Sequence, residues 1–209
     1  MPILPGLAKM PLHELRGLTR ITQALLAAQT VLAVAAVFIA YLSKVGANSP
    51  ASGLIVPCQL AIFVAAGIAF LMWTYRAKSN AGATGARGLS YSPAMAVGSY
   101  FIPILNLGMP AQAMQELYKS SADPRDWEAV DSLRLIHVWW FFWISGNIAG
   151  VVAWRLQTGE AYQASASVIG MLSSGSDIGT MAASLCLIPI IGKIAGLQHD
   201  SMAMAAEFE

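Results

Sequence analysis

The stretch that decides the fold is residues 73–119, WTYRAKSNAGATGARGLSYSPAMAVGSYFIPILNLGMPAQAMQELYK. It holds most of the polar and conformationally special residues of a chain that is otherwise strongly apolar. Pro103 and Pro110 interrupt an apolar run there, and Asn106 lies between them. An interior proline removes one helical hydrogen bond and clashes with the preceding turn. We therefore expect a broken element over residues 91–118, with two short helices and a looped or extended joint.

The composition of the whole chain indicates a membrane protein. Of its 209 residues, 56% are hydrophobic and 11% are charged, and the net charge is +1. Globular proteins carry about 25% charged residues, so this chain has too few charges to coat a soluble domain of its length. The near-neutral balance also argues against a nucleic-acid partner. We expect a single membrane domain over residues 1–209.

Outside the broken element, four apolar segments are long enough to cross a bilayer, because a hydrocarbon core about 30 Å thick needs about 20 helical residues. They cover residues 18–42, 53–75, 135–155 and 177–197. The sequence therefore predicts an all-α integral membrane protein with four transmembrane helices and a proline-broken, re-entrant helical element.

Two residues and one segment near the ends of these spans carry more detailed expectations. Pro57 is expected in the first turn of its span, where its missing N–H costs nothing. Asp177 is expected in the first turn of the last span, because a helix N-terminus favours negative charge. Residues 157–176 are rich in polar and small side chains. We expect them to form an outer loop that contains an amphipathic helix at 164–172.

Basic residues predict the orientation in the membrane. The expected loop 76–90 contains Arg76, Lys78 and Arg87 and no acidic residue. The N-terminal arm, residues 1–17, is also basic at its end. Cytoplasmic loops carry an excess of Lys and Arg, so both segments are expected in the cytoplasm. With four spans, the C-terminus returns to the same side.

Charge also bears on whether the broken element re-enters or crosses the bilayer. The following segment, residues 116–134, is densely charged. If the element crosses, Lys119, Arg125 and Arg134 all lie outside, against the positive-inside rule. If it re-enters, its non-helical joint must be buried in protein or line a wet cavity. We favour re-entry, and crossing remains the alternative.

Several short motifs follow each other with a distinctive order and spacing. They are Trp73-Thr74-Tyr75-Arg76-Ala77 with Asn80, Gly85-Ala86, Ser92-Pro93, Ala96-Val97-Gly98, Phe101-Ile102-Pro103-Ile104-Leu105-Asn106-Leu107, Pro110, Gln112, Glu116, Trp139-Trp140 and Ser145-Gly146-Asn147-Ile148. Over residues 70–155 this pattern resembles DUF4328, a family of bacterial membrane proteins. The chain departs from the family at Ala94 and Ser99, usually aromatic, and at Gly108-Met109, usually Trp-Arg or similar. The resemblance implies a multi-span protein of the bacterial inner membrane, with both termini cytoplasmic by the charge argument, and it implies no activity.

The broken element offers one candidate site. Carbonyl groups freed around Asn106 could bind a cation, a polar headgroup or a small substrate, as broken helices do in transporters. The alternative is that Asn106 caps a short helix that starts at Gly108-Met109, with Pro110 in its first turn. Both interpretations stay open at this stage.

A second candidate site lies at the cytoplasmic end. Arg76, Asn80 and Arg87 could bind lipid phosphates beside the cytoplasmic leaflet, or the two arginines could determine topology only. Glu116 is expected to form a structural ion pair with Arg76 or Arg87 rather than to act as a catalytic acid. The full set of candidate residues is Arg76, Asn80, Arg87, Pro103, Asn106, Pro110, Gln112 and Glu116.

No catalytic residue, cofactor or metal site is expected. His137 lies in a predicted span, but a haem would need a second axial ligand and no other predicted span contains a histidine. Cys58 and Cys186 lie in apolar runs and are interpreted as small buried hydrophobes. No arrangement of nucleophile and base is recognisable, so we do not expect an enzyme.

The functional expectation is a non-catalytic accessory or scaffold subunit of a bacterial inner-membrane complex. It rests on the apparent lack of intramembrane acids and of repeats, and on small-residue faces at 145–150 and 170–183 that suit partner helices. The alternative is a small transporter, or a lipid- or small-molecule-binding protein, that uses the break between Pro103 and Pro110. The expected partners are membrane lipids and other integral membrane proteins, with no nucleic acid.

Overall fold

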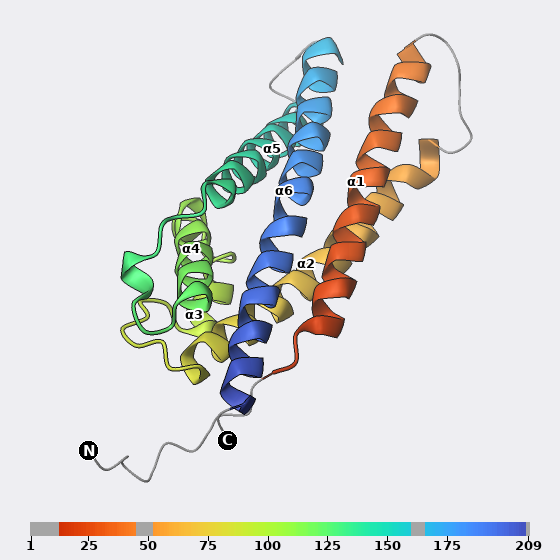
Figure 1. Ribbon diagram of the computed structural model, residues 1–209. Helices are drawn as coiled ribbons and strands as arrows, with labels where there is room; N and C mark the ends of the chain where they lie inside the picture. The colour runs from red at the N-terminus through yellow and green to blue at the C-terminus, as the bar shows by residue number, and fades with distance from the viewer. Residues whose placement is uncertain (1–12, 45–51, 160–165, 208–209) are drawn as a thin grey trace. The chain divides into compact units, whose positions relative to one another are not determined.

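The computed structural model describes residues 13–44, 52–159 and 166–207, and these residues form helices and connecting turns without a strand. Figure 1 labels the helices. In chain order the elements are α1 (Arg16–Lys44), α2 (Ser52–Ala83), α3 (Pro93–Gly98), the 3-10 helix η1 (Leu105–Leu107), α4 (Met109–Ala122), the 3-10 helix η2 (Trp127–Ala129), α5 (Arg134–Thr158) and α6 (Ala166–Glu207). The predicted all-α fold is confirmed.

Four of these helices are long and apolar enough to cross a membrane. They are the segments Arg16–Ile39 of α1, Pro57–Ala83 of α2, Arg134–Thr158 of α5 and Ala166–Ser201 of α6. By contrast, α3 has 6 residues and α4 has 14, so each is shorter than the roughly 20 residues that a span needs. The protein is therefore a multi-pass membrane protein with four candidate spans, as predicted.

The second span is longer than the sequence suggested. The loop expected from Arg76 begins only after Ala83, because α2 continues to that residue. Its continuation buries Ala77 and Ala81, one helical turn apart, and this packing outweighs the weak helix propensity of the Ser, Asn and Gly residues there. Pro57 is not in the first turn either, since α2 begins at Ser52 and contains Pro57 in its interior.

The last span also begins earlier than predicted. α6 starts at Ala166, about three turns before Asp177 at 3.6 residues per turn, so Asp177 lies inside the helix and not at its N-terminus. Residues 166–176, expected as part of a loop, are helical. The predicted helix at 164–172 starts outside the described residues and otherwise merges into α6.

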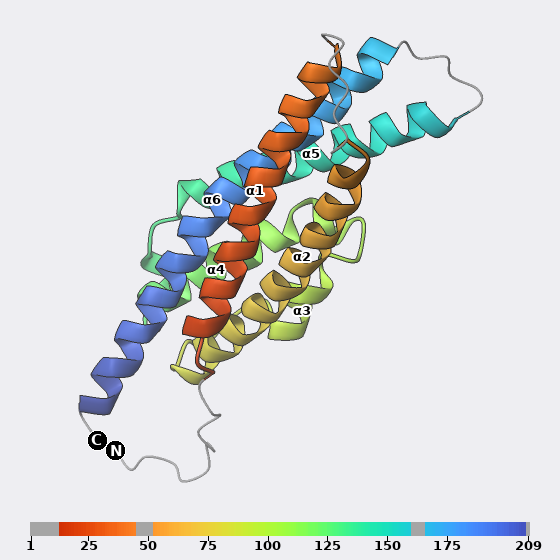
Figure 2. The same ribbon diagram turned by 90° about the vertical axis from the view of Figure 1, so that its right-hand side faces the viewer.

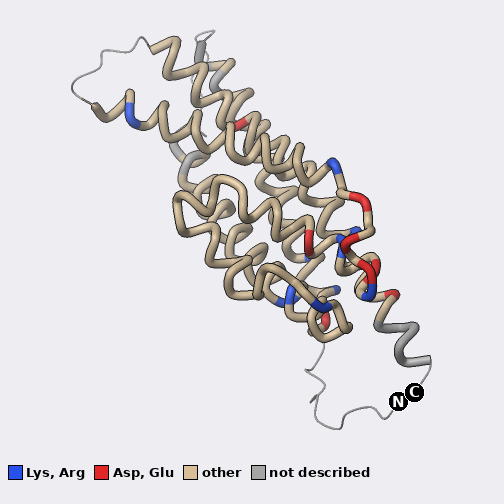
Figure 3. The backbone as a smooth tube through the Cα atoms, turned by 90° about the vertical axis from the view of Figure 1, so that its left-hand side faces the viewer, with Lys and Arg blue, Asp and Glu red and all other residues tan. Residues whose placement is uncertain are grey.

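The chain divides into two compact units. Unit 1 comprises residues 1–17, 71–132 and 193–209, and unit 2 comprises residues 18–70 and 133–192. Most charged residues belong to the segments of unit 1, whereas long stretches of the remaining tube carry none (Figure 3). Each unit has its own packing.

In unit 2, segments of α1, α2, α5 and α6 pack against each other. The α1 and α6 segments run alongside one another (Figures 1 and 2), and Gln23 Nε2 donates to the Ile188 carbonyl at 3.0 Å. The rings of Phe63 and Trp143 stack between α2 and α5 with centroids 6.1 Å apart. Small residues let backbones approach closely in lipid, which brings α5 and α6 together at Gly146 and Gly179.

In unit 1, α3 and α4 pack together as the two arms of a short helical hairpin. α3 begins with a capping bond, in which Ser92 Oγ accepts from the Met95 N–H at 3.2 Å, followed by Pro93. The chain then turns through residues 99–108 before α4, which confirms the predicted broken element. Phe101 and Ile104 in this turn are 71% and 81% exposed, so the tip of the hairpin is apolar.

Because α5 and α6 are in close contact at Gly179, we expect that no side chain larger than that of glycine fits at this position. A Cβ atom there would lie 2.7 Å from Gly146 Cα, so Gly179→Ala forces the backbones apart. We expect this substitution to lower the free energy of unfolding by about 1–3 kcal/mol, measured by thermal or denaturant unfolding in detergent. Gly175→Ala, where a Cβ would meet nothing within 4 Å, is the matched control in the same helix. Equal stability of the two variants would contradict the close packing.

Candidate functional site

Unit 1 contains a buried ion pair between Lys78 of α2 and Glu116 of α4. The Glu116 carboxylate also accepts from the backbone N–H of Ser90 at 2.6 Å and of Tyr91 at 3.2 Å. Glu116 therefore connects α4 with α2 and also with the segment that precedes α3. The expected pairing with Arg76 or Arg87 is wrong, because the extension of α2 beyond residue 75 carries Lys78 into the interior.

A second polar cluster surrounds Asn80, which is fully buried. Its side-chain amide accepts from the His13 N–H at 2.8 Å and donates to the His13 carbonyl at 2.8 Å, as well as to Gln198 Oε1 at 3.3 Å. Gln198 in turn donates to the Ala77 carbonyl and to Ser121 Oγ, both at 2.9 Å. These bonds join the entry to α1 with α2, α4 and α6. They give Asn80 a structural role and keep it away from lipid phosphates.

Three other predicted site residues are Gln112, which shares the partner Tyr91 with Glu116, and the two arginines. Gln112 accepts through Oε1 from the Tyr91 hydroxyl at 2.6 Å. Arg87 is exposed, and its backbone carbonyl accepts from Trp127 Nε1 at 2.8 Å. Arg76 is half-buried. The predicted residues are thus spread over unit 1, and a phosphate-binding role for the two arginines stays a prediction.

The structure around Asn106 differs in part from both interpretations of the break, the binding site at freed carbonyl groups and the cap of a short helix. Asn106 lies inside η1, and its N–H donates to the Ile102 carbonyl at 2.8 Å. Gly108 is the N-cap of α4, with Pro110 in the first turn as predicted. Asn106 therefore does not cap α4, because it is two residues too early. Its Oδ1 atom is buried and has no hydrogen-bond partner among the described residues.

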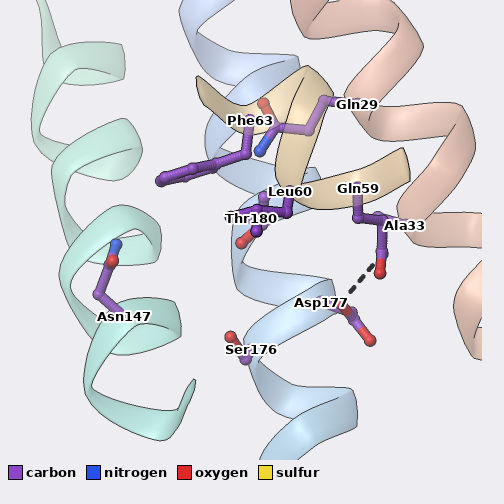
Figure 4. A pocket seen from close by; sticks show the side chains of 9 residues that line it. All are labelled: Gln29, Ala33, Gln59, Leu60, Phe63, Asn147, Ser176, Asp177 and Thr180. Carbon is purple, nitrogen blue, oxygen red and sulfur yellow. Dashed lines mark hydrogen bonds between the residues drawn. The ribbon is translucent and has the colours of Figure 1, made fainter. Parts of the chain in front are cut away.

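Sequence reasoning missed a cavity in unit 2 that is lined by both polar and apolar side chains and opens between segments of all four candidate spans (Figure 4). Its volume is about 290 Å³. It is lined by Gln29 and Ala33 of α1, Gln59, Leu60 and Phe63 of α2, Asn147 of α5, and Ser176, Asp177 and Thr180 of α6. Six of these nine side chains are polar, which is unusual among helices that are apolar enough to span a membrane.

The charge in this cavity comes from Asp177, the one acidic residue among the described residues of unit 2. Its carboxylate accepts from Gln59 Nε2 at 3.5 Å, a long hydrogen bond. The described residues of the lining include no lysine, arginine or histidine. The cavity therefore combines one carboxylate with amide and hydroxyl groups, which can hydrogen-bond a polar ligand and attract a positive one.

This cavity was hard to find because its polar residues are far apart in the sequence. Gln29 and Gln59 are polar residues in largely apolar runs, and helix packing brings them into the same lining as Asn147 and Asp177. A usable signal was that all four predicted spans carry polar residues within apolar sequence. Because Asp177 is expected at the end of a helix, the sequence does not identify it as an acidic residue inside a span.

The ion pair in unit 1 predicts a strong effect of Lys78→Met, which retains the length of the side chain. The substitution leaves Glu116 buried without its charged partner, and breaking a buried pair costs about 3–5 kcal/mol. We expect a loss of that order in the free energy of unfolding, measured in detergent. Lys119→Met, at a more accessible position on α4, should change it by about 1 kcal/mol or less. A small effect at Lys78 would contradict the structural role of the pair.

The geometry can be compared with known proteins. A family model described as "Domain of unknown function (DUF4328)" matches residues 42–195. No curated protein and no solved structure matches the chain. The matched region includes α2 to α5 entirely and most of α6, and thus both the Lys78–Glu116 pair and most of the residues that line the cavity. It covers about three quarters of the 209 residues, and the chain therefore belongs to the DUF4328 family.

Proposed function

We propose that this protein binds a small polar solute in the cavity of unit 2, and that it works as a small transporter or solute-binding membrane protein. The observation that carries the proposal is the convergence of six polar side chains from four candidate spans on one cavity. Polar and ionisable residues among membrane spans are costly and mark substrate or ion pathways. The volume of about 290 Å³ is far above the roughly 10–15 Å³ that one water molecule needs, which leaves room for a small solute.

The proposed binding site is therefore the cavity, and not the break between Pro103 and Pro110 that the sequence suggests. At the break, residues 101–104 are exposed, and the Asn106 Oδ1 atom is buried without a hydrogen-bond partner among the described residues. The cavity offers several donors and acceptors together with a carboxylate. A site with several converging polar groups is the better candidate for binding.

An accessory or scaffold role is the second proposal, but its support is now weaker. It relies on small-residue faces that suit partner helices, and Gly146 and Gly179 of these faces contact each other within unit 2. It also rested on a lack of intramembrane acids, whereas Asp177 lies inside the candidate span Ala166–Ser201. A partner protein that purifies with the chain in stable proportion would favour this second role.

We further propose that the protein resides in a bacterial inner membrane, with both termini in the cytoplasm. Unit 1 gathers residues from both chain ends together with residues 71–132, which supports a common side for all of them. The basic residues of this unit support the cytoplasmic side. We infer that the hairpin of α3 and α4 re-enters the membrane, because its arms are too short to cross and its tip is apolar.

This orientation predicts which residues an impermeant thiol reagent reaches. In a background with Cys58→Ala and Cys186→Ala, Asp126→Cys should resist a membrane-impermeant maleimide in intact cells and react after lysis. Asp126 is exposed, so a lack of reaction before lysis reports the side and not burial. Thr158→Cys, exposed at the end of α5, should react in intact cells. Labelling of Asp126→Cys before lysis would mean that residues 91–118 cross the bilayer.

Solute binding predicts that water enters the cavity. In the same cysteine-free background, Thr180→Cys should react with the neutral reagent 2-hydroxyethyl methanethiosulfonate in reconstituted vesicles, because only a hydrated thiol ionises and reacts. Leu185→Cys, on the exposed apolar surface of α6, should react at least about tenfold more slowly in lipid. Equal, slow reaction at both positions would indicate a dry cavity and would remove the basis of the proposed function.

A further inference from the structure

We propose that the solute is a small organic cation, such as an alkylammonium compound, and that Asp177 is its counter-charge. This inference rests on the proposed function, because it assigns a chemical class to the solute of the same cavity. Three properties of the cavity carry it: its charge, its size and its aromatic wall.

The first property is the sign of the charge. Asp177 is the acidic residue of the lining, and among the described residues no basic side chain lines the cavity to neutralise it. Gln59 Nε2 lies 3.5 Å from Asp177 Oδ1, so its amide is a weak partner at the limit of a hydrogen bond. A carboxylate among membrane helices requires either a proton or a positive partner. A cationic solute supplies that partner, whereas an anionic solute would be repelled.

The second property is the size of the cavity. Metal cations are held by oxygen ligands at about 2.0–2.6 Å and prefer several carboxylates or carbonyls. The cavity of about 290 Å³ is too large for such a coordination sphere around one carboxylate. Among the described residues, no group of three or more His, Cys, Asp or Glu side chains could hold a metal ion. The volume instead lies near the lower end of the range for organic ligands.

The third property is an aromatic wall. Phe63 lines the cavity and points into the space between α2 and α5 (Figure 4), where its ring stacks on Trp143 with an interplanar angle of 7°. Aromatic rings attract organic cations through their quadrupole, and quaternary ammonium groups are recognised in this way. Gln29 and Thr180 add an amide and a hydroxyl group that can hydrogen-bond the rest of the solute, and Asn147, whose Nδ2 donates to the Trp143 carbonyl at 2.7 Å, adds its amide oxygen. A lining that contains both a carboxylate and an aromatic ring thus fits an ammonium compound better than a neutral one.

The test compares two thiol reagents of similar size at Thr180→Cys, in vesicles that contain the purified full-length protein without Cys58 and Cys186. One is 2-aminoethyl methanethiosulfonate, an organic cation, and the other is the neutral hydroxyethyl reagent. The negative charge should raise the rate of the cationic reagent relative to the neutral one on the order of tenfold. Adding Asp177→Asn should remove this preference, whereas Asp200→Asn, an exposed acid on the same helix, should keep it.

A second measurement needs no change at Asp177. Millimolar tetramethylammonium or ethylammonium should slow the reaction of Thr180→Cys with the neutral reagent, and acetamide at the same concentration should not. If the neutral reagent reacts but neither the charge preference nor the protection by ammonium compounds is found, the cationic class is wrong and solute binding stands. If the neutral reagent does not react at all, the proposed function fails as well. Protection by sodium ions equal to that by tetramethylammonium would contradict an organic solute.

Discussion

A charged group among apolar helices must have a partner, and this constraint governs both units of the protein. Moving an ion out of water costs several kcal/mol unless a counter-charge and hydrogen bonds replace its hydration. In unit 1, Glu116 meets this requirement within the chain, with Lys78 and two backbone N–H groups. In unit 2, Asp177 has the long bond from Gln59 and faces a cavity. The same physical requirement therefore leads to a structural role for one carboxylate and to a binding role for the other.

The satisfied network of unit 1 explains how a stretch with little regular structure can be held in one conformation. The segment between α2 and α3 contains Gly85 and Gly88, whose positive φ angles of 100° and 71° suit glycine. Such a segment has a large conformational entropy to lose on folding. The bonds from Ser90 and Tyr91 to the buried Glu116 carboxylate fix its end. Charge-assisted bonds of this kind are about twice as strong as neutral ones, which makes Glu116 the anchor of the hairpin.

The fold could be predicted from the sequence to the extent that hydropathy and proline decide it. Spans follow from runs of apolar residues, and the break follows from Pro103 and Pro110, because both signals are local. The ends of the helices are predicted less accurately. The extension of α2 buries Ala77 and Ala81, and this burial depends on packing with segments that are distant in the sequence. The partner of Glu116 was misassigned for the same reason. Lys78 became its partner only because α2 continues past Tyr75.

The cavity could not be predicted from the sequence, because it is a property of packing and not of any segment. Gln29, Gln59 and Asn147 lie in three different helices, and hydropathy treats each as a tolerated exception in an apolar run. These three residues line the same cavity because of the distance at which their helices pack. Gly146 sets that distance for α5 and α6, since a Cβ there would lie 3.2 Å from Gly179 Cα. On α6, Ser176 and Asp177 precede Gly179 by three and two residues, and they line the cavity together with Asn147, the neighbour of Gly146. A contact that closes the helices at one point thus positions the polar groups beside it, so the small residues that looked ready for a partner protein instead shape the proposed binding site.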